Sequence, residues 1–217
     1  MNRSLARVST RGFTLLELLV VLAVIIILLA TVLPVDTYSS RTKARMISCE
    51  SNLRQIGVAA CVYSRDHQDK SPSEGWRVEK DDVTGRSDPT NFFLKILAAV
   101  PSPRCFWCPL DLGRVAAASP AGLTRSNLSY FVNVDANQTN RASDSVLAGD
   151  RCLSVNSKPV SAGVLLVTPG KTVTWTPTAH ASGGNFVFAD GFTEQAEPNI
   201  NQVLHSQPSP ENHLVLP

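Results

Sequence analysis

The sequence predicts an α+β fold in which one long N-terminal helix packs on an antiparallel β-sheet head. The first observation is a nearly continuous apolar run from Phe13 to Leu33. The second is a single apolar stripe between residues 49 and 63, which is typical of an amphipathic helix. The third is a series of short β-like runs, separated by turn residues, that begins near residue 126.

The apolar run has the length of a membrane span and contains one charged residue, Glu17. A helix from Phe13 to Leu33, at about 1.5 Å per residue, is roughly 30 Å long, like the hydrocarbon core of a bilayer. A secretory signal peptide would have a shorter apolar region and a small-residue cleavage site, and the sequence offers only a weak site around Ala30. A carboxylate in a lipid-facing helix costs about 2.5 to 3.5 kcal/mol. We therefore expect Glu17 to have a partner.

The net charge of the chain is small, and its basic residues are unevenly distributed along the sequence. The formal net charge of +2 gives no general case for nucleic acid as a partner. Subtracting Arg3, Arg7 and Arg11, which precede the apolar run, from the 20 basic residues leaves 17 against 18 acidic ones. Basic residues also follow the run, so the flanking charge does not settle the orientation of a membrane anchor.

A second helix is predicted beyond Pro34, over residues 35–66. Its apolar residues recur at alternating steps of four and three, and they are Cys49, Leu53, Ile56, Ala60 and Tyr63. Pro34 either kinks one continuous helix or ends the first helix, and the sequence leaves both interpretations open. Residues 77–90 are expected to form a surface loop, and residues 91–100 a short helix that stops before two prolines.

The remaining chain is predicted to form strands. Four β-like runs cover residues 128–134, 145–149, 163–167 and 171–175. Thr168-Pro169-Gly170 can turn the third run back on the fourth. Asp190-Gly191 suits a two-residue type I′ hairpin turn, with Phe186 and Phe188 on one face of the preceding strand. The tail after Pro198 is expected to lie irregularly on the surface.

The stretch Arg11-Gly12-Phe13-Thr14-Leu15-Leu16-Glu17, followed by the apolar run, resembles the N-terminal signal of type IV pilins and type II secretion pseudopilins. The resemblance implies cleavage by a prepilin peptidase after Gly12 and N-methylation of Phe13. It also implies that Glu17 pairs with the N-terminal amine of a neighbouring subunit, which would neutralise both charges in a low dielectric. The alternative is a plain anchor whose Glu17 snorkels to the membrane interface.

The resemblance also implies a pilin-like domain organisation and location. We expect a leader at residues 1–12, a transmembrane and polymerisation helix at 13–34 and an amphipathic helix at 35–66. A periplasmic α+β head at 67–197 and an irregular tail at 198–217 would follow. The chain would cross the inner membrane once, with its N-terminus in the cytoplasm before cleavage. The implied partners are the prepilin peptidase, copies of the chain and other pseudopilins, and the inner-membrane secretion platform.

The stretch from His180 to Asp190-Gly191 resembles the His-x9-Asp-Gly signature of a bacterial pseudopilin-like subgroup. Residues 108–111 (CPLD) and 129–133 (SYFVN) also resemble internal landmarks of that subgroup. His180 and Asp190 would be metal ligands or an acid–base pair in a functional interpretation. In a structural interpretation, which we favour, Asp190-Gly191 only forms a hairpin turn and His180 only forms a hydrogen bond to the backbone. No cofactor is expected, although calcium is an alternative, because major pseudopilins often bind it in C-terminal loops. Asp150 and Asp190 are the available oxygen donors.

The five cysteines favour a structural disulfide. Cys49 and Cys61 lie twelve residues apart on one helix, about 18 Å along its axis, so they cannot bond to each other. Cys105 and Cys108 form a CxxC pair, but zinc needs four ligands and only Cys152 and distant histidines remain. One or two disulfides are expected outside the cytoplasm, for example Cys49 to Cys108, with at least one thiol left over.

Three classes of function are considered from the sequence. The leading one is a structural subunit that polymerises through its N-terminal helix into a short periplasmic filament of a type II secretion or related system. The second is a minor pilin or adhesin that binds a target at a filament tip. The third is a membrane-tethered enzyme using His180 and Asp190, and the sequence shows no nucleophile–base set or phosphate loop to support it. We therefore expect no catalytic activity.

Overall fold

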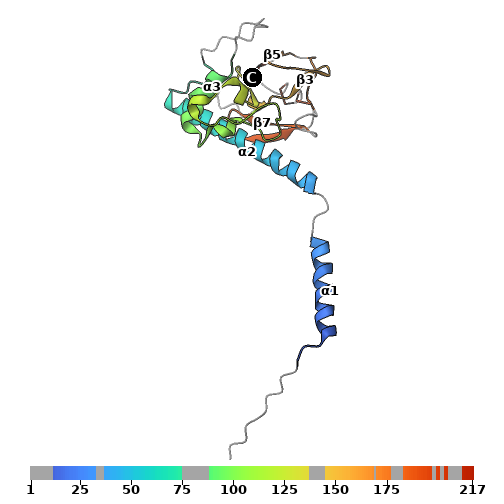
Figure 1. The fold of residues 1–217 in the computed structure, drawn as a ribbon. Coiled ribbons are helices and arrows are strands. Elements are labelled where there is room, and N and C mark those ends of the chain that lie inside the picture. The colour runs from blue at the N-terminus through green and yellow to red at the C-terminus, as the bar shows by residue number, and fades with distance from the viewer. Residues whose placement is uncertain are drawn as a thin grey trace, which may run out of the picture. The chain divides into compact units, whose positions relative to one another are not determined.

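The computed structural model describes residues 12–32, 37–74, 88–136, 145–168, 170–176, 183–196, 199–200, 203–204 and 212–217. The chain divides into two compact units, Met1–Arg41 and Thr42–Pro217, which we describe separately (Figure 1). We call the second unit the head.

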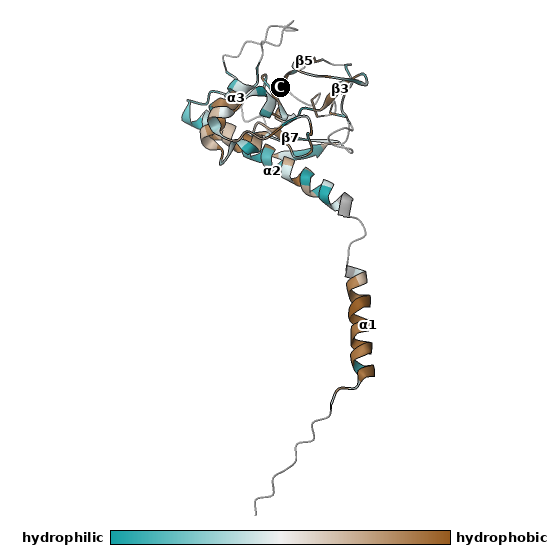
Figure 2. Cartoon of the chain, in the orientation of Figure 1, coloured by the Kyte–Doolittle hydropathy of each residue, from teal (hydrophilic) through white to brown (hydrophobic). Residues whose placement is uncertain are grey.

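The first unit contains helix α1 (Leu15–Val32), which is apolar apart from Glu17 in its first turn and Thr31 near its end, and Figure 2 shows it largely brown. Thr14 begins the helix, because its Oγ1 accepts a hydrogen bond of 3.2 Å from the Glu17 N–H. Over the part of the chain that the structure describes, no helix has both the length and the hydropathy needed to cross a membrane.

Helix α2 (Thr37–Asp66) confirms the second predicted helix. Four residues of the predicted stripe, Cys49, Leu53, Ile56 and Ala60, have no exposed surface, and Tyr63 packs against the same core. The stripe is therefore the face by which α2 covers the rest of the head. Pro34 lies outside the described residues, so neither interpretation of it is tested.

Short helices follow α2 in the chain. They are α3 (Thr90–Ile96), η1 (Leu97–Ala99), η2 (Pro103–Phe106), η3 (Pro120–Gly122) and η4 (Arg125–Asn127). The helix predicted at residues 91–100 is confirmed as α3 with η1. Asp88 fixes its start, because Asp88 Oδ1 accepts from the Thr90 N–H at 2.9 Å. Pro103 opens η2, where a missing N–H costs nothing.

The strands form two antiparallel sheets, which confirms the predicted α+β class. The larger sheet has the order β5-β9-β1-β2-β7-β8 and the smaller one β4-β3-β6. The strands are β1 (Tyr130–Asn133), β2 (Val146–Asp150), β3 (Leu153–Val155), β4 (Lys158–Pro159), β5 (Gly163–Val167), β6 (Val173–Trp175), β7 (Gly184–Phe188), β8 (Thr193–Ala196) and β9 (Asn212–Leu216).

Both faces of the larger sheet are buried, each in its own core. Successive side chains of a strand point to opposite faces. Tyr130 and Val132 of β1 accordingly join the core formed with α2 and α3, while Phe131 joins the core formed with the smaller sheet. The head therefore consists of a helical layer, a six-stranded sheet and a three-stranded sheet (Figure 1).

The prediction of an irregular tail after Pro198 is wrong for its last residues. Strand β9 lies between β5 and β1 in the larger sheet, and Leu214, Val215 and Leu216 are buried. The proline- and asparagine-rich stretch before β9 hid the short apolar run in the sequence. Burial of that run on both faces of the sheet outweighs the local turn composition.

The predicted type I′ turn at Asp190-Gly191 is also wrong. A type I′ turn needs a positive φ at both central residues, but of Asp190 and Gly191 only Gly191 has one, of 89°. The Gly191 N–H donates to the Phe188 carbonyl at 3.0 Å. Phe188 in turn donates to the Phe192 carbonyl at 2.8 Å, so the loop has three residues and closes with a glycine bulge. A turn with two positive φ values, 47° and 65°, instead occurs at Asn156-Ser157, between β3 and β4.

The strands predicted at residues 163–167 and 171–175 exist, but they do not pair with each other. Strand β5 pairs with β9 in the larger sheet, whereas β6 pairs with β3 in the smaller one. The chain does turn between them, because the Lys171 N–H donates to the Thr168 carbonyl at 3.1 Å. This turn therefore carries the chain from one sheet to the other.

Candidate functional site

The residues predicted for processing lie just before α1. Gly12 and Phe13 are not helical, and 74% of the Phe13 surface is exposed. Apart from Gly12 and its two chain neighbours, no heavy atom of the described residues lies within 4 Å of the point where a Cβ on Gly12 would sit. Within the described residues, the peptide bond between Gly12 and Phe13 is therefore open to an approaching enzyme.

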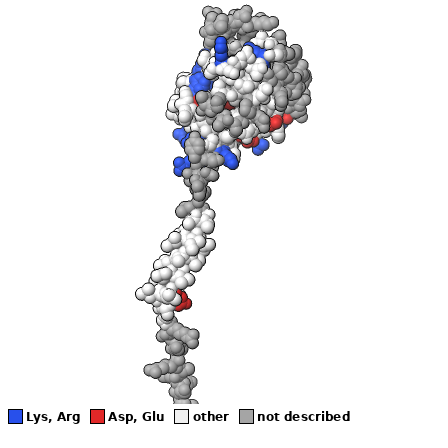
Figure 3. Space-filling model, turned by 90° about the vertical axis from the view of Figure 1, so that its right-hand side faces the viewer, with Lys and Arg blue, Asp and Glu red and all other residues white. Residues whose placement is uncertain are grey.

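Glu17 is the one charged residue of α1. It lies in the first turn, where the positive end of the helix dipole favours a carboxylate. Figure 3 shows the apolar helix as white apart from one acidic group. Thr14 and Glu17 also have the spacing of a capping box, a signal that the sequence reading did not use.

The apolar side chains of α1 are exposed on all sides of the helix. Leu15 is 82% exposed and Ile26 65%. A helix that is apolar all round needs apolar surroundings, which within this unit no other element supplies among the described residues. Lipids or neighbouring helices are molecules that would supply such surroundings.

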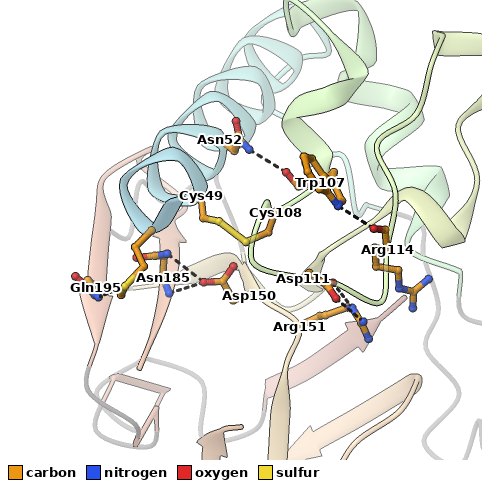
Figure 4. Close-up of a disulfide and its surroundings, with 11 residues drawn as sticks. Cys49, Asn52, Trp107, Cys108, Asp111, Arg114, Asp150, Arg151, Asn185 and Gln195 are labelled. Atoms are coloured by element: carbon orange, nitrogen blue, oxygen red, sulfur yellow. Dashed lines mark hydrogen bonds and ion pairs between the residues drawn. A yellow bond between two sulfur atoms is a disulfide. The ribbon is translucent and has the colours of Figure 1, made fainter. Parts of the chain in front are cut away.

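In the head, a disulfide joins Cys49 of α2 to Cys108 in the loop after η2 (Figure 4). Their Cα atoms are 5.2 Å apart and both residues are buried. The sequence analysis named this pairing as one example of a structural disulfide. Two hydrogen bonds of 3.0 Å hold the same loop, from Asn52 Nδ2 to the Trp107 carbonyl and from Trp107 Nε1 to the Arg114 carbonyl.

The CPLD stretch contributes an ion pair to this region. Both oxygens of Asp111 accept hydrogen bonds from Arg151, at 2.6 Å from Nε and 2.8 Å from an Nη (Figure 4). Burial alone would lower the pKa of Arg151, but the hydrogen bonds and charge of Asp111 together raise it. Asp111 therefore fastens the disulfide loop to the residue that follows β2.

Asp150 and Asp190, the two predicted calcium ligands, form hydrogen bonds in different parts of the head. Asp150 is buried, and its Oδ2 accepts from the N–H and the Nδ2 of Asn185, at 2.7 Å and 3.2 Å. Asp190 Oδ1 accepts from the Phe192 N–H at 2.8 Å in the turn after β7. Asn185 and Asp190 lie at opposite ends of β7, more than about 10 Å apart at 3.3 Å per residue. The structure therefore does not bring the two carboxylates together, and calcium binding stays a prediction.

The Asp190-Gly191 pair has a packing role in the structure. A Cβ on Gly57 of α2 would lie 2.5 Å from Val187 Cγ2 and 3.0 Å from the Gly191 Cα. Cys61 Sγ also lies 3.3 Å from the Ala189 carbonyl oxygen, as a hydrogen-bond donor. Helix and hairpin turn thus pack closely through two glycines, a contact that sequence reasoning missed. His180 lies outside the described residues.

Burial changes the ionisation of two of the three cysteines outside the disulfide, Cys105 and Cys152. Burial raises the pKa of Cys105 to about 12 and that of Cys152 to about 11, the latter helped by the charge of Asp111. A thiolate is the reactive form of cysteine, so both thiols are inert near neutral pH. Cys105 is not bonded to Cys108, because Cys108 pairs with Cys49, although Cys105 and Cys108 form a CxxC pair in the sequence.

Comparison with known families matches one part of the chain. Residues 7–33, which are 27 of the 217, match the model described as the prokaryotic N-terminal methylation motif. Searches of curated proteins and of solved structures gave no match. The matched stretch includes Gly12, Phe13 and Glu17, whereas the His-x9-Asp-Gly stretch is not part of it.

The methylation motif indicates how the N-terminal segment is processed and anchored. It implies processing by a prepilin peptidase, a membrane-anchored N-terminus and assembly with other pilin-type subunits. Subunits of this type are structural proteins. Residues 7–33 therefore carry the N-terminal signal of type IV pilins and pseudopilins.

Proposed function

We propose that this chain is a pseudopilin-like structural subunit of a periplasmic filament in a type II secretion or related system. A prepilin peptidase cuts it between Gly12 and Phe13 and methylates the new amine of Phe13. The subunit then polymerises through α1 with its own copies and with other pseudopilins, on an inner-membrane secretion platform. The filament acts mechanically and the subunit has no catalytic role.

The observation that carries this proposal is Glu17 within the matched motif. Cleavage after Gly12 places an ammonium group four residues before this carboxylate. In a bundle of apolar helices each of these charges is costly alone, and the pair on neighbouring subunits offsets the cost. The exposed apolar surface of α1 supplies the remaining attraction between subunits.

The proposed topology follows from the same segment. The apolar run from Phe13 to Leu33 inserts as a single pass in the inner membrane, with the arginines of the leader in the cytoplasm before cleavage. The head then lies in the periplasm, an oxidising compartment in which the Cys49–Cys108 disulfide persists.

A second candidate function is a minor pilin or adhesin-type module at a filament tip. The exposed surface of the head would then bind a target, and few copies would be needed per filament. Counting this subunit against the other pilins in purified filaments separates the two functions. Many copies per filament favour the leading proposal, and about one copy per filament favours the tip module.

Mass spectrometry of the N-terminal peptide from the native host tests the processing step. We expect a mature chain that begins with N-methylated Phe13 and lacks the leader. Gly12→Val should leave the precursor uncut, because a branched side chain beside the scissile bond obstructs the peptidase. A wild-type chain that begins elsewhere, such as after Ala30, would refute the proposal.

A further inference from the structure

Three side chains that can bind a metal meet at the disulfide. Cys49 comes from α2, Cys108 from the loop after η2 and Asp150 from β2, and their ligand atoms all lie within 4.8 Å of one another (Figure 4). Their exposures are 0%, 1% and 1%. The sequence did not reveal this set, because its members are far apart along the chain.

We propose that these three residues bind one zinc ion in the reduced chain, before the disulfide forms. Every chain is synthesised with free thiols, so the reduced form always precedes the oxidised one. Two thiolates and a carboxylate are donors that zinc accepts in proteins. The site is therefore either a metal site or a disulfide, according to the redox state of the two cysteines.

The geometry suits this exchange. Zinc binds sulfur at about 2.3 Å and carboxylate oxygen at about 2.0 to 2.2 Å, so neighbouring ligand atoms lie roughly 3.5 Å apart. Cα atoms 5.2 Å apart allow the two sulfurs to reach that separation by rotation about Cα–Cβ once the bond between them is open. Asp150 keeps its position in either state, because Asn185 of β7 holds its Oδ2.

Electrostatics also favours a cation in the reduced state. Asp150 is 1% exposed, and burial removes a carboxylate from the water that would otherwise solvate its charge. A divalent cation would offset this charge and those of the thiolates, since metal coordination deprotonates the thiols that it binds. The Arg151 guanidinium, the neighbour of Asp150 in sequence, is already engaged by Asp111.

Cys105 is the fourth ligand in this assignment. It precedes Cys108 by three residues, the CxxC spacing at which two cysteines bind one zinc ion. Cys105 is 4% exposed and lies in η2, directly before the same loop. The Cys105 Sγ is not among the ligand atoms that lie within 4.8 Å of one another, so it would have to turn toward Cys108 when zinc binds.

Reduction and oxidation interconvert the thiol and disulfide forms of this site. A phosphine reductant gives two electrons to the Cys49–Cys108 bond and becomes a phosphine oxide, taking its oxygen from water, while each sulfur gains a proton. Each thiol that then binds zinc releases its proton to solvent. Oxidation of the pair by a disulfide reagent removes two electrons, rebuilds the sulfur–sulfur bond and releases the metal.

The test is zinc binding by the full chain in detergent. Reduced with a phosphine and stripped of metal, the wild type should bind one Zn²⁺ per chain in competition with a chromophoric chelator. The oxidised chain should bind none. Asp150→Asn, Cys49→Ser and Cys105→Ser should each lower the affinity at least tenfold, whereas the control Cys152→Ser should not change it.

Cobalt substitution separates loss of the ligands from loss of the fold. The reduced wild type loaded with Co²⁺ should show an intense thiolate-to-cobalt charge-transfer band that disappears on oxidation. Failure of the reduced wild type to bind zinc or cobalt stoichiometrically would overturn the proposal. Unchanged affinity in folded Asp150→Asn would overturn the role of that carboxylate, and in Cys105→Ser the fourth-ligand assignment.

Discussion

The apolar side chains of helix α1 are exposed, whereas most large apolar side chains of the head are buried. In α1 the leucines, isoleucines and valines with described side chains are at least 44% exposed. In the head, two cores bury apolar residues from Cys49 to Leu216 on both faces of the larger sheet. The head therefore has two hydrophobic cores of its own, whereas the described residues of α1 belong to neither core. This difference predicts that changes in α1 affect assembly and changes in the head affect stability.

The largest expected effect is on filament assembly, from Glu17→Val. The variant should insert and be cleaved after Gly12 as well as the wild type, because an apolar group replaces a charge. Filaments should be absent or rare, since each incoming subunit would bury an unpaired ammonium at a cost of about 3 to 5 kcal/mol. Cross-linking and shearing of filaments from cells measure assembly, and a gel shift measures cleavage.

Two controls sharpen that result. Glu17→Asp should give an intermediate yield of filaments, because its carboxylate is one methylene short. Urea unfolding of the head should be the same in both variants and the wild type. Normal filaments from Glu17→Val would contradict the charge-pairing model and leave Glu17 as a snorkelling acid.

The next effect is on the stability of the head, from removal of the disulfide. The bond closes a loop of 59 residues, so the loop-entropy model gives a loss of about 4 kcal/mol for the double variant Cys49→Ala and Cys108→Ala. The midpoint and slope of urea unfolding measure the loss. Cys152→Ala is the control for removal of a thiol. A loss of under about 1 kcal/mol in the double variant would contradict a stabilising role for the bond.

The sequence predicted those parts of the fold that have a regular period. Four residues of the α2 stripe became fully buried, and the β-like runs became β1, β2, β5, β6 and β7. The signal at Gly12, Phe13 and Glu17 was also visible, because its residues are contiguous. Periodicity reports which face of an element is buried, and that is local information.

Pairing was the part that the sequence did not reveal. Strand β9 inserts between β5 and β1, and this separates β5 from its sequence neighbour β6. The Cys49, Cys108 and Asp150 cluster likewise joins three distant segments. The turn at Asn156-Ser157 lacks the glycine on which recognition of a type I′ turn usually depends. Such features follow from packing of the whole head.

A smaller effect is expected where α2 meets the β7–β8 turn. Gly57→Val adds atoms where even a Cβ would lie 2.5 Å from Val187 and 3.0 Å from the Gly191 backbone. The overpacking should cost about 1 to 3 kcal/mol in urea unfolding. Ala44→Val, at an exposed position of the same helix, controls for the helix propensity of valine and should cost under about 1 kcal/mol. Equal losses in the two variants would contradict the close contact.

The last effect is a loss of head stability that is confined to alkaline pH and absent near neutral pH. Burial raises the pKa of Cys105 from 9.0 to about 12, so above pH 9 the folded head binds a proton that the unfolded chain has lost. The contribution is present below pH 9 and disappears as the pH rises toward 12, at up to about 1.4 kcal/mol per pH unit. Burial shifts the pKa of Tyr130 in the same direction, which deepens the decline at the upper end.

Urea unfolding at several pH values between about 7 and 11 measures this decline. Cys105→Ala should be less stable at neutral pH, because a buried sulfur is lost, but its stability should fall less steeply above pH 9. Glu17→Val should follow the wild-type curve, since α1 contributes nothing to the two cores of the head. An equal slope in Cys105→Ala and the wild type would show that this thiol titrates normally in the folded head. The alkaline sensitivity would then have to come from another buried group, of which Tyr130 and Cys152 are the first to substitute.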